Sequence, residues 1–396
     1  IMRSMFKQIS TCLFFLAAIA VTNQAYSCPF CDAPSLTLVE QLSASQAAVL
    51  VQWAGGEVAN REKSFSGTTN YEILEIVTDE SGKLKKGQTV KLDRYRASQK
   101  GDLFVLLGTL TDDRIEWGSP LEVSETSFNY MKQAPPQDAP TQKRLAYFMK
   151  FLEYPDPLIA TDAYSEFANA PYKDIAKLRT IMPREKIREW LKNPEDAPSR
   201  TTRTGLYGLM LGLSGNEDDA EFMKAKILQE TDDFRLGIDG VMSGYLVLTG
   251  EAGLDVIDKQ KLQNRDVPFS ETFAAMQALR FMWTYSDDVI KADRLRQSMR
   301  ILLDRPNLAD LVIVDLARWN DWGVMDKLML VYNQDEYDVP SIKRAIVRFM
   351  LIAEKDDSTV AEGEVPEHVL KAKKNMELLR KIDPKTVKAA ERYFFD

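Results

Sequence analysis

The sequence predicts a two-part protein in which a small β-barrel or curled sheet is followed by an all-α stack of helix pairs. Short apolar and β-branched runs recur between residues 47 and 117 and alternate with polar, glycine-containing loops, as strands and their turns do. From residue 141 to 355, amphipathic segments of helical length follow one another with short turns between them. A proline-rich stretch at 133–140 separates the two patterns, and we interpret it as a linker between domains.

Residues 1–27 have the pattern of a secretory signal peptide. The basic residues Arg3 and Lys7 come first, and an apolar run at residues 9–21 follows them. Ala25 and Ser27 then supply the small residues that a signal peptidase requires. The apolar run is shorter than the roughly 20 residues that a transmembrane helix needs. We therefore predict cleavage after Ser27, export to the periplasm or the extracellular space, and no transmembrane segment.

That cleavage leaves Cys28 as the first residue of the mature chain and Cys31 as its only other cysteine, because Cys12 leaves with the signal. In an oxidising compartment we expect these two cysteines to form a local disulfide. Three alternatives stay open: a redox-active pair, half of a metal site, and a lipid-modified Cys28 that anchors the N-terminus. A thioredoxin-like redox pair needs a strand in front of the motif, and none precedes it here.

The β domain is predicted over residues 28–132. It begins with a short helix within residues 35–46, and its predicted strands are 47–53, 71–77, 89–92, 103–107 and 114–117. The long loop after the first strand, the basic turn at 83–87 and the Gly-Asp start of the fourth strand resemble the OB-type barrel of the netrin/TIMP-like family over residues 28–126. That family often begins at a cysteine, as this domain does, but it ties this cysteine to others further along the barrel, and this chain lacks them.

The helical region is predicted over residues 141–355. Asp156 is suited to cap a helix that begins at Pro157, and Gly215 and Asn216 are suited to end one helix and start the next. The starts of every second predicted helix lie about 28 to 37 residues apart, which is the size of a helix-pair repeat.

Residues 338–346, and less closely residues 156–163, resemble the second helix of a HEAT-type repeat. The region 141–355 as a whole therefore resembles HEAT/armadillo-like solenoids. An irregular helical bundle is the alternative. Residues 366–396 are predicted to be a C-terminal helical cap with a polar outer face.

Composition and motifs disfavour several classes of function. The formal net charge of -8 disfavours binding to nucleic acid. The single histidine, His368, leaves no basis for a histidine-dependent mechanism, and we expect it in a surface or capping position. Because neither a nucleotide-binding motif nor a set of metal ligands is present in the sequence, we predict a protein that is not an enzyme, with no catalytic residue, no metal and no cofactor.

The turn that contains Trp319 and Trp322 is the candidate binding site. With Arg318 and Asp321 beside them, the two tryptophans are suited to present a flat aromatic surface to a peptide or a sugar. The alternative is that both rings pack between neighbouring helices.

We therefore expect an exported, non-catalytic scaffold or binding protein that uses a helical-repeat surface to hold a protein or peptide partner. The alternative function is thiol-redox or metal-dependent chemistry centred on Cys28 and Cys31.

Overall fold

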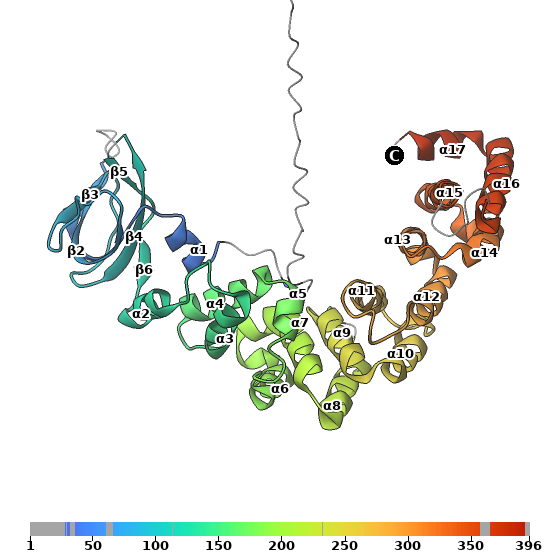
Figure 1. The fold of residues 1–396 in the computed structure, drawn as a ribbon, viewed down its shortest axis with the longest axis horizontal. Helices are drawn as coiled ribbons and strands as arrows, with labels where there is room; N and C mark the ends of the chain where they lie inside the picture. Colours follow the sequence, from blue (N-terminus) through green and yellow to red (C-terminus); the bar gives the residue numbers. More distant parts are fainter. Residues whose placement is uncertain are drawn as a thin grey trace, which may run out of the picture.

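The computed structural model describes residues 28, 30–31, 36–60, 66–112, 114–231, 233–356 and 365–392; the predicted signal peptide lies outside them. Through the described residues, the chain forms a six-stranded antiparallel sheet followed by a curved stack of helices (Figure 1). The predicted fold class, a β module followed by an all-α stack, is confirmed. The sheet lies at one end of the arc and the C-terminal helices lie at the other.

The sheet contains all five predicted strands and one more. The strands are β1 Ala47–Glu57, β2 Thr68–Asp79, β3 Thr89–Leu92, β4 Leu103–Thr111, β5 Arg114–Trp117 and the additional β6 Leu121–Val123. Their order is β3-β2-β1-β4-β5, and β6 pairs with β4. The register between β1 and β2 shifts at three points, which bends the strands and curls the sheet. In the described residues, β3 and β5 remain the two edges, so the sheet does not close into the barrel that the sequence favours.

The two faces of the sheet are buried in different ways. Val49 and Val51 of β1 pack with residues of β2, β3 and β4 in a small core of the β module alone. Leu50, which points to the other face, and Val105 of β4 belong to the same hydrophobic core as the helices. This alternation follows from the two-residue period of a strand. One face of the β module therefore packs into the core of the helical stack, and the other face forms a separate core of its own.

The helices follow in chain order, and two of them flank the sheet. The α-helices are α1 Leu38–Ser43, α2 Glu125–Gln133, α3 Thr141–Phe148, α4 Pro157–Asn169, α5 Tyr172–Ala176, α6 Arg184–Lys192, α7 Pro198–Ser214, α8 Glu217–Leu228, α9 Ile238–Thr249, α10 Glu251–Ile257, α11 Phe269–Tyr285, α12 Ala292–Ile301, α13 Pro306–Arg318, α14 Met325–Val331, α15 Pro340–Glu354, α16 Glu367–Ile382 and α17 Pro384–Glu391. The short 3-10 helices are η2 Met149–Phe151, η3 Pro194–Asp196, η5 Leu302–Asp304, η6 Trp322–Val324 and η7 Asp335–Tyr337, and a π-helical turn, η4, spans Asp258–Leu262.

Inner and outer helices alternate along the arc. Helices α7, α9, α11, α13 and α15 line its inner side, and α6, α8, α10, α12, α14 and α16 lie outside them (Figure 1). The capping signals fall where the sequence places them. The Asp156 side chain accepts a hydrogen bond from the backbone N–H of Leu158, and Asn216 forms a reciprocal capping box with Asp219.

The predicted linker at 133–140 is a turn between two helices: α2 ends at Gln133 and α3 begins at Thr141. Helix α2 packs against α4, and the Tyr130 hydroxyl donates a 2.7 Å hydrogen bond to buried Asp162. The division into two domains at this stretch stays a prediction, and these contacts join its two sides.

Helices α7 and α9 approach each other through glycines. The spacing Gly-x-x-Gly-x-x-x-Gly occurs in α7 and again around the start of α9, at Gly205, Gly208 and Gly212 and at Gly237, Gly240 and Gly244. A Cβ placed on Gly212 would lie 2.1 Å from the carbonyl oxygen of Gly244, so nothing larger than hydrogen fits there. We call these six residues the glycine seam. It lies near the middle of the arc (Figure 1).

Candidate binding surface

Helix α13 leaves one face uncovered on the inner side of the stack. Pro306 begins the helix after the extended residue Arg305, and its apolar core face carries Leu308, Val312, Ile313 and Leu316. The residues at i, i+3 and i+7 on the remaining face are Leu311, Val314 and Arg318, with exposed fractions of 37% and 38% for the first two and 72% for the Arg318 side chain. We call these three residues the α13 stripe. Helix α13 itself lies on the inner side of the arc (Figure 1).

A buried carboxylate ties the stripe to the neighbouring helix. Asp315 accepts a 2.7 Å hydrogen bond from Nε of Arg280 in α11, and the Arg318 guanidinium lies 3.8 Å from its other oxygen. Burial raises the pKa of the Asp315 carboxyl above its ordinary value, and the two guanidinium groups oppose that shift. The arrangement holds a cation beside two exposed apolar side chains.

The structure places Trp319 in the interior. The residue is 4% exposed, and its ring stacks face to face on Trp283 with 4.4 Å between the centroids. Arg296 lies over the Trp283 ring and donates hydrogen bonds of 2.6 and 2.9 Å to the backbone carbonyl of Trp319. The Trp319 ring therefore packs between helices, as the alternative interpretation of this turn holds.

The other residues of the turn are also engaged with neighbours. Buried Asp321 accepts two hydrogen bonds from Arg300, a bidentate pair. The half-buried Trp322 ring stacks on His368, and its Nε1 donates a 2.7 Å hydrogen bond to Asp356. His368 lies 2.9 Å from the same carboxylate, which places the histidine in a link between α16 and this turn. Of the four predicted binding residues, Arg318 alone presents most of its side chain to solvent.

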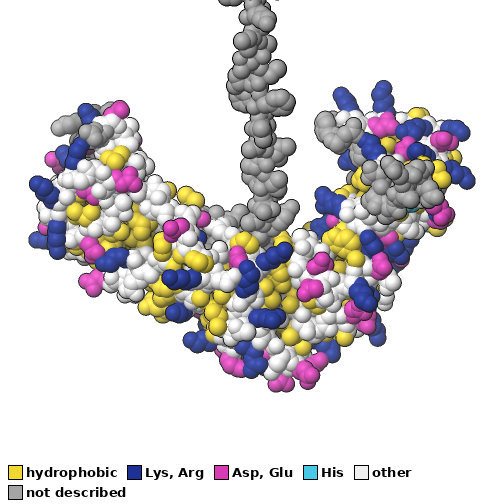
Figure 2. All heavy atoms as spheres, in the orientation of Figure 1, with side chains coloured by type: hydrophobic (Ala, Val, Ile, Leu, Met, Phe, Trp, Pro, Cys, Tyr) yellow, Lys and Arg dark blue, Asp and Glu magenta, His cyan; other side chains and the backbone are white. Residues whose placement is uncertain are grey.

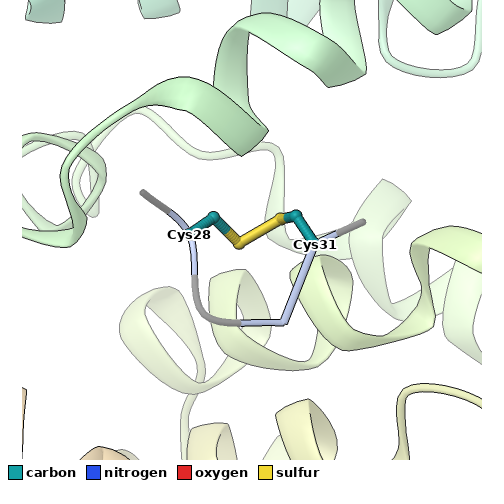
Figure 3. The surroundings of a disulfide bond; sticks show 2 residues. All are labelled: Cys28 and Cys31. Carbon is teal, nitrogen blue, oxygen red and sulfur yellow. A yellow bond between two sulfur atoms is a disulfide. The ribbon is translucent and has the colours of Figure 1, made fainter. Parts of the chain in front are cut away.

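The disulfide loop, which Cys28 and Cys31 close, packs against residues of α4, α7 and α11. The predicted disulfide is present (Figure 3), and Cys28 is buried with its backbone N–H donating to the Ala168 carbonyl at 3.0 Å. The Phe30 ring lies 5.0 Å from that of Phe281 in α11. A Cβ on Gly205 would come within 2.9 Å of the Phe30 Cβ, so the first glycine of the seam makes room for the loop.

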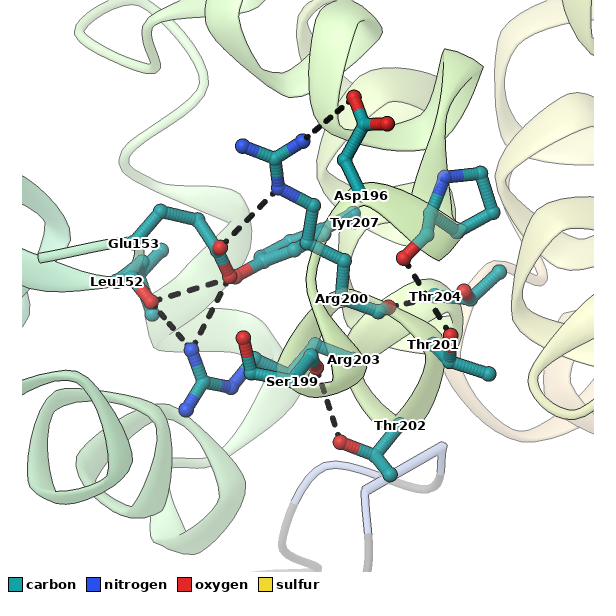
Figure 4. A network of polar contacts seen from close by, with 11 residues as sticks. Leu152, Glu153, Asp196, Ser199, Arg200, Thr201, Thr202, Arg203, Thr204 and Tyr207 are labelled. Atoms are coloured by element: carbon teal, nitrogen blue, oxygen red, sulfur yellow. Dashed lines mark hydrogen bonds and ion pairs between the residues drawn. The ribbon is translucent and has the colours of Figure 1, made fainter. Parts of the chain in front are cut away.

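A buried polar network fixes the start of α7 (Figure 4). Glu153 accepts hydrogen bonds from Arg200 at 3.2 Å, Arg203 at 3.1 Å and the Tyr207 hydroxyl at 2.5 Å. Arg203 also donates to the Leu152 carbonyl at 2.6 Å. Burial and the Glu153 carboxylate raise the pKa of Tyr207. Each charge has an opposite partner, so the network holds the helix in place. Sequence reasoning missed it, although two arginines inside an apolar helix were a signal.

The described residues contain no cluster of three or more His, Cys, Asp or Glu side chains placed to hold a metal ion. Within the same residues, no helix has the length and apolar character needed to cross a membrane. Comparison with protein-family models, with curated proteins and with solved structures gave no match. The function of this chain is therefore inferred from its own residues.

Proposed function

We propose that this protein is an exported, non-catalytic scaffold or binding protein that holds a protein partner on the inner side of its helical stack. The observation that supports this most directly is the α13 stripe, two exposed apolar residues and a cation on a curved stack. Stacks of helix pairs use extended concave surfaces in this way, and exposed apolar groups beside a polar rim are typical of protein interfaces.

The finer identity of the two parts belongs to the same proposal. The alternation of inner and outer helices supports a HEAT-like solenoid, and the small antiparallel sheet supports an OB/NTR-like module. Export is proposed from the signal-peptide pattern of residues 1–27, and a disulfide-bonded Cys28–Cys31 pair is consistent with an oxidising compartment.

The test is site-specific photocrosslinking in an envelope extract. A photoreactive residue at Val314 should crosslink a partner, and one at Leu370 on outer helix α16, which is 56% exposed, should not. The double variant Leu311→Asp and Val314→Asp should lose the partner while its circular dichroism stays that of the wild type. Equal crosslinking from both positions, or capture that survives the double variant, would argue against an inner binding surface.

The alternative is thiol-redox or metal-dependent function at Cys28 and Cys31, which is favoured by the short spacing of the two cysteines. Replacing both with serine should leave the stack folded, because the disulfide closes only a small loop. If the binding function is correct, partner capture survives this change and is lost when residues 141–354 are deleted. If the thiol function is correct, the serine variant loses activity while keeping its fold. Titration of free thiols and mass spectrometry of the N-terminus would show whether Cys28 is oxidised, reduced or acylated.

A further inference from the structure

A hollow of about 570 Å³ opens between α3 and α6, away from the α13 stripe. Its volume lies within the range of roughly 300–1,000 Å³ typical of ligand sites. Figure 2 shows hydrophobic and basic side chains intermixed over this part of the arc. None of the residues predicted as site residues from the sequence lines it.

The floor of the hollow is aromatic and preformed. Tyr147 of α3 is held by a 2.8 Å hydrogen bond from its hydroxyl to the Tyr130 carbonyl. Trp190 of α6 is held by its ring contact with Tyr207, 4.9 Å between centroids. Ile181 extends the floor, and its side chain is 55% exposed. These groups offer an apolar seat that needs little rearrangement to receive a ligand.

The rim of the hollow is basic. Lys143 of α3, Lys150 of η2 and Lys186 of α6 line it, and no Asp or Glu is among the lining residues. In the part of the chain that the structure describes, none of the three lysines forms an ion pair with a carboxylate. The chain as a whole has a net charge of -8, but the charged side chains that line this hollow are all basic.

We propose that this hollow binds an acidic peptide segment of the protein partner, with a large apolar or aromatic side chain on the floor and flanking carboxylates at the lysines. The proposal rests on the proposed binding function and adds the chemistry of the segment recognised. Aromatic anchors in preformed apolar pockets dominate the affinity of such contacts, and complementary charges at the rim select the partner and speed association.

The experiment measures fluorescence anisotropy of a synthetic labelled peptide, one tryptophan flanked on both sides by glutamates, titrated with the full mature protein. We expect saturable binding that weakens as salt rises. A peptide with lysines in place of glutamates, and one with alanine in place of the tryptophan, should each bind at least about tenfold more weakly. Equal binding of all acidic peptides regardless of the tryptophan would overturn the proposal, because charge alone would explain it.

Matched variants of the protein locate the site. The triple variant Lys143→Glu, Lys150→Glu and Lys186→Glu reverses the charge of the rim. It should weaken peptide binding about tenfold or more. The same charge change on exposed lysines of α16 should leave binding unchanged, and that control is Lys373→Glu, Lys374→Glu and Lys381→Glu. All six side chains are on the surface, so both variants should fold. Equal losses in the two variants would refute the assignment of the hollow.

Two further results separate this proposal from its alternatives. Dodecanoate that binds at the hollow while the peptide does not would identify an anionic amphiphile as the ligand and refute peptide recognition. The variant Leu311→Asp and Val314→Asp should retain peptide binding, because the α13 stripe is remote from the hollow. If peptide binding fails while partner capture on the inner side persists, the assignment of the hollow as a peptide site is wrong and the proposed function stands. If the peptide binds at the hollow while capture on the inner side fails, the inner binding surface is refuted and the hollow remains a peptide site.

Discussion

Replacing Gly212 with alanine should force α7 and α9 apart. The new Cβ would lie 2.1 Å from the Gly244 carbonyl oxygen and 2.3 Å from the Gly244 Cα. Both are backbone atoms, which cannot rotate out of the way as a side chain can. Reaching an ordinary contact of at least 3.4 Å from 2.1 Å requires the helices to separate locally by about 1.3 Å.

The sign of this effect opposes the intrinsic preference of the helix. Alanine in place of glycine inside a helix ordinarily stabilises by roughly 0.5–1 kcal/mol. Overpacking a close contact costs about 1–3 kcal/mol, and moving α7 also loosens the buried side chains beside the seam. We therefore expect the free energy of unfolding to fall by about 1–2 kcal/mol in Gly212→Ala.

Equilibrium unfolding in urea, followed by circular dichroism, measures this change. Gly323→Ala in η6 is the matched control, because its nearest contact would be Arg300 Nη2 at 3.4 Å, an ordinary separation. The control should be as stable as the wild type or slightly more stable. If Gly212→Ala unfolds at the same urea concentration as Gly323→Ala or higher, the close approach of α7 and α9 is not as described.

Two other predictions concern the helical core and its charges. Leu209→Ala should lower the free energy of unfolding by about 2–5 kcal/mol, because this side chain is fully buried. Phe273→Ala should lower it by less, because that ring is half-buried. In thermal melts, Leu209→Ala should therefore unfold at a lower temperature than Phe273→Ala. The pKa of Glu271 lies below its ordinary value of 4.5. Burial alone would raise this pKa, but the ion pairs with Arg235 and Lys261 together lower it by more. A carboxyl whose pKa is lowered in the folded state stabilises the fold above pH 4.5. The wild type should therefore be more stable than Glu271→Gln near neutral pH, and this difference should shrink as the pH falls through the folded-state pKa. A difference that grows in acid would contradict the ion pairing.

Local patterns predicted the elements of this fold well. The five predicted strands are confirmed because apolar alternation and the turns between strands are encoded in adjacent residues. The caps at Asp156 and Asn216 are confirmed for the same reason, since a cap depends on two or three neighbouring positions. Strand β6 was missed, because three residues after a Gly-Ser-Pro break give too short a pattern.

Features that join distant residues were harder to predict. The burial of Trp319, at the end of α13, depends on Trp283 of α11, two α-helices earlier in the chain, and neither residue indicates the other. The hollow combines side chains from α3, η2 and α6, which share no motif. The glycine seam differs, because its repeated spacing is visible in the sequence. Its meaning became clear only from the contact of α7 with α9, since isolated glycines in a helix usually indicate weakness.

The glycine seam has a mechanical consequence. It lies near the middle of the arc, between the sheet at one end and α16 and α17 at the other (Figure 1), so the angle between α7 and α9 helps to set the distance between the two ends. A small change in the angle between α7 and α9 would shift each end of the arc in proportion to the distance of that end from the seam. The distance between the two ends of the arc therefore depends in part on the absence of methyl groups at the seam. Phe30 of the disulfide loop lies against Gly205 at one end of the seam, so a side chain at this glycine would also displace the loop.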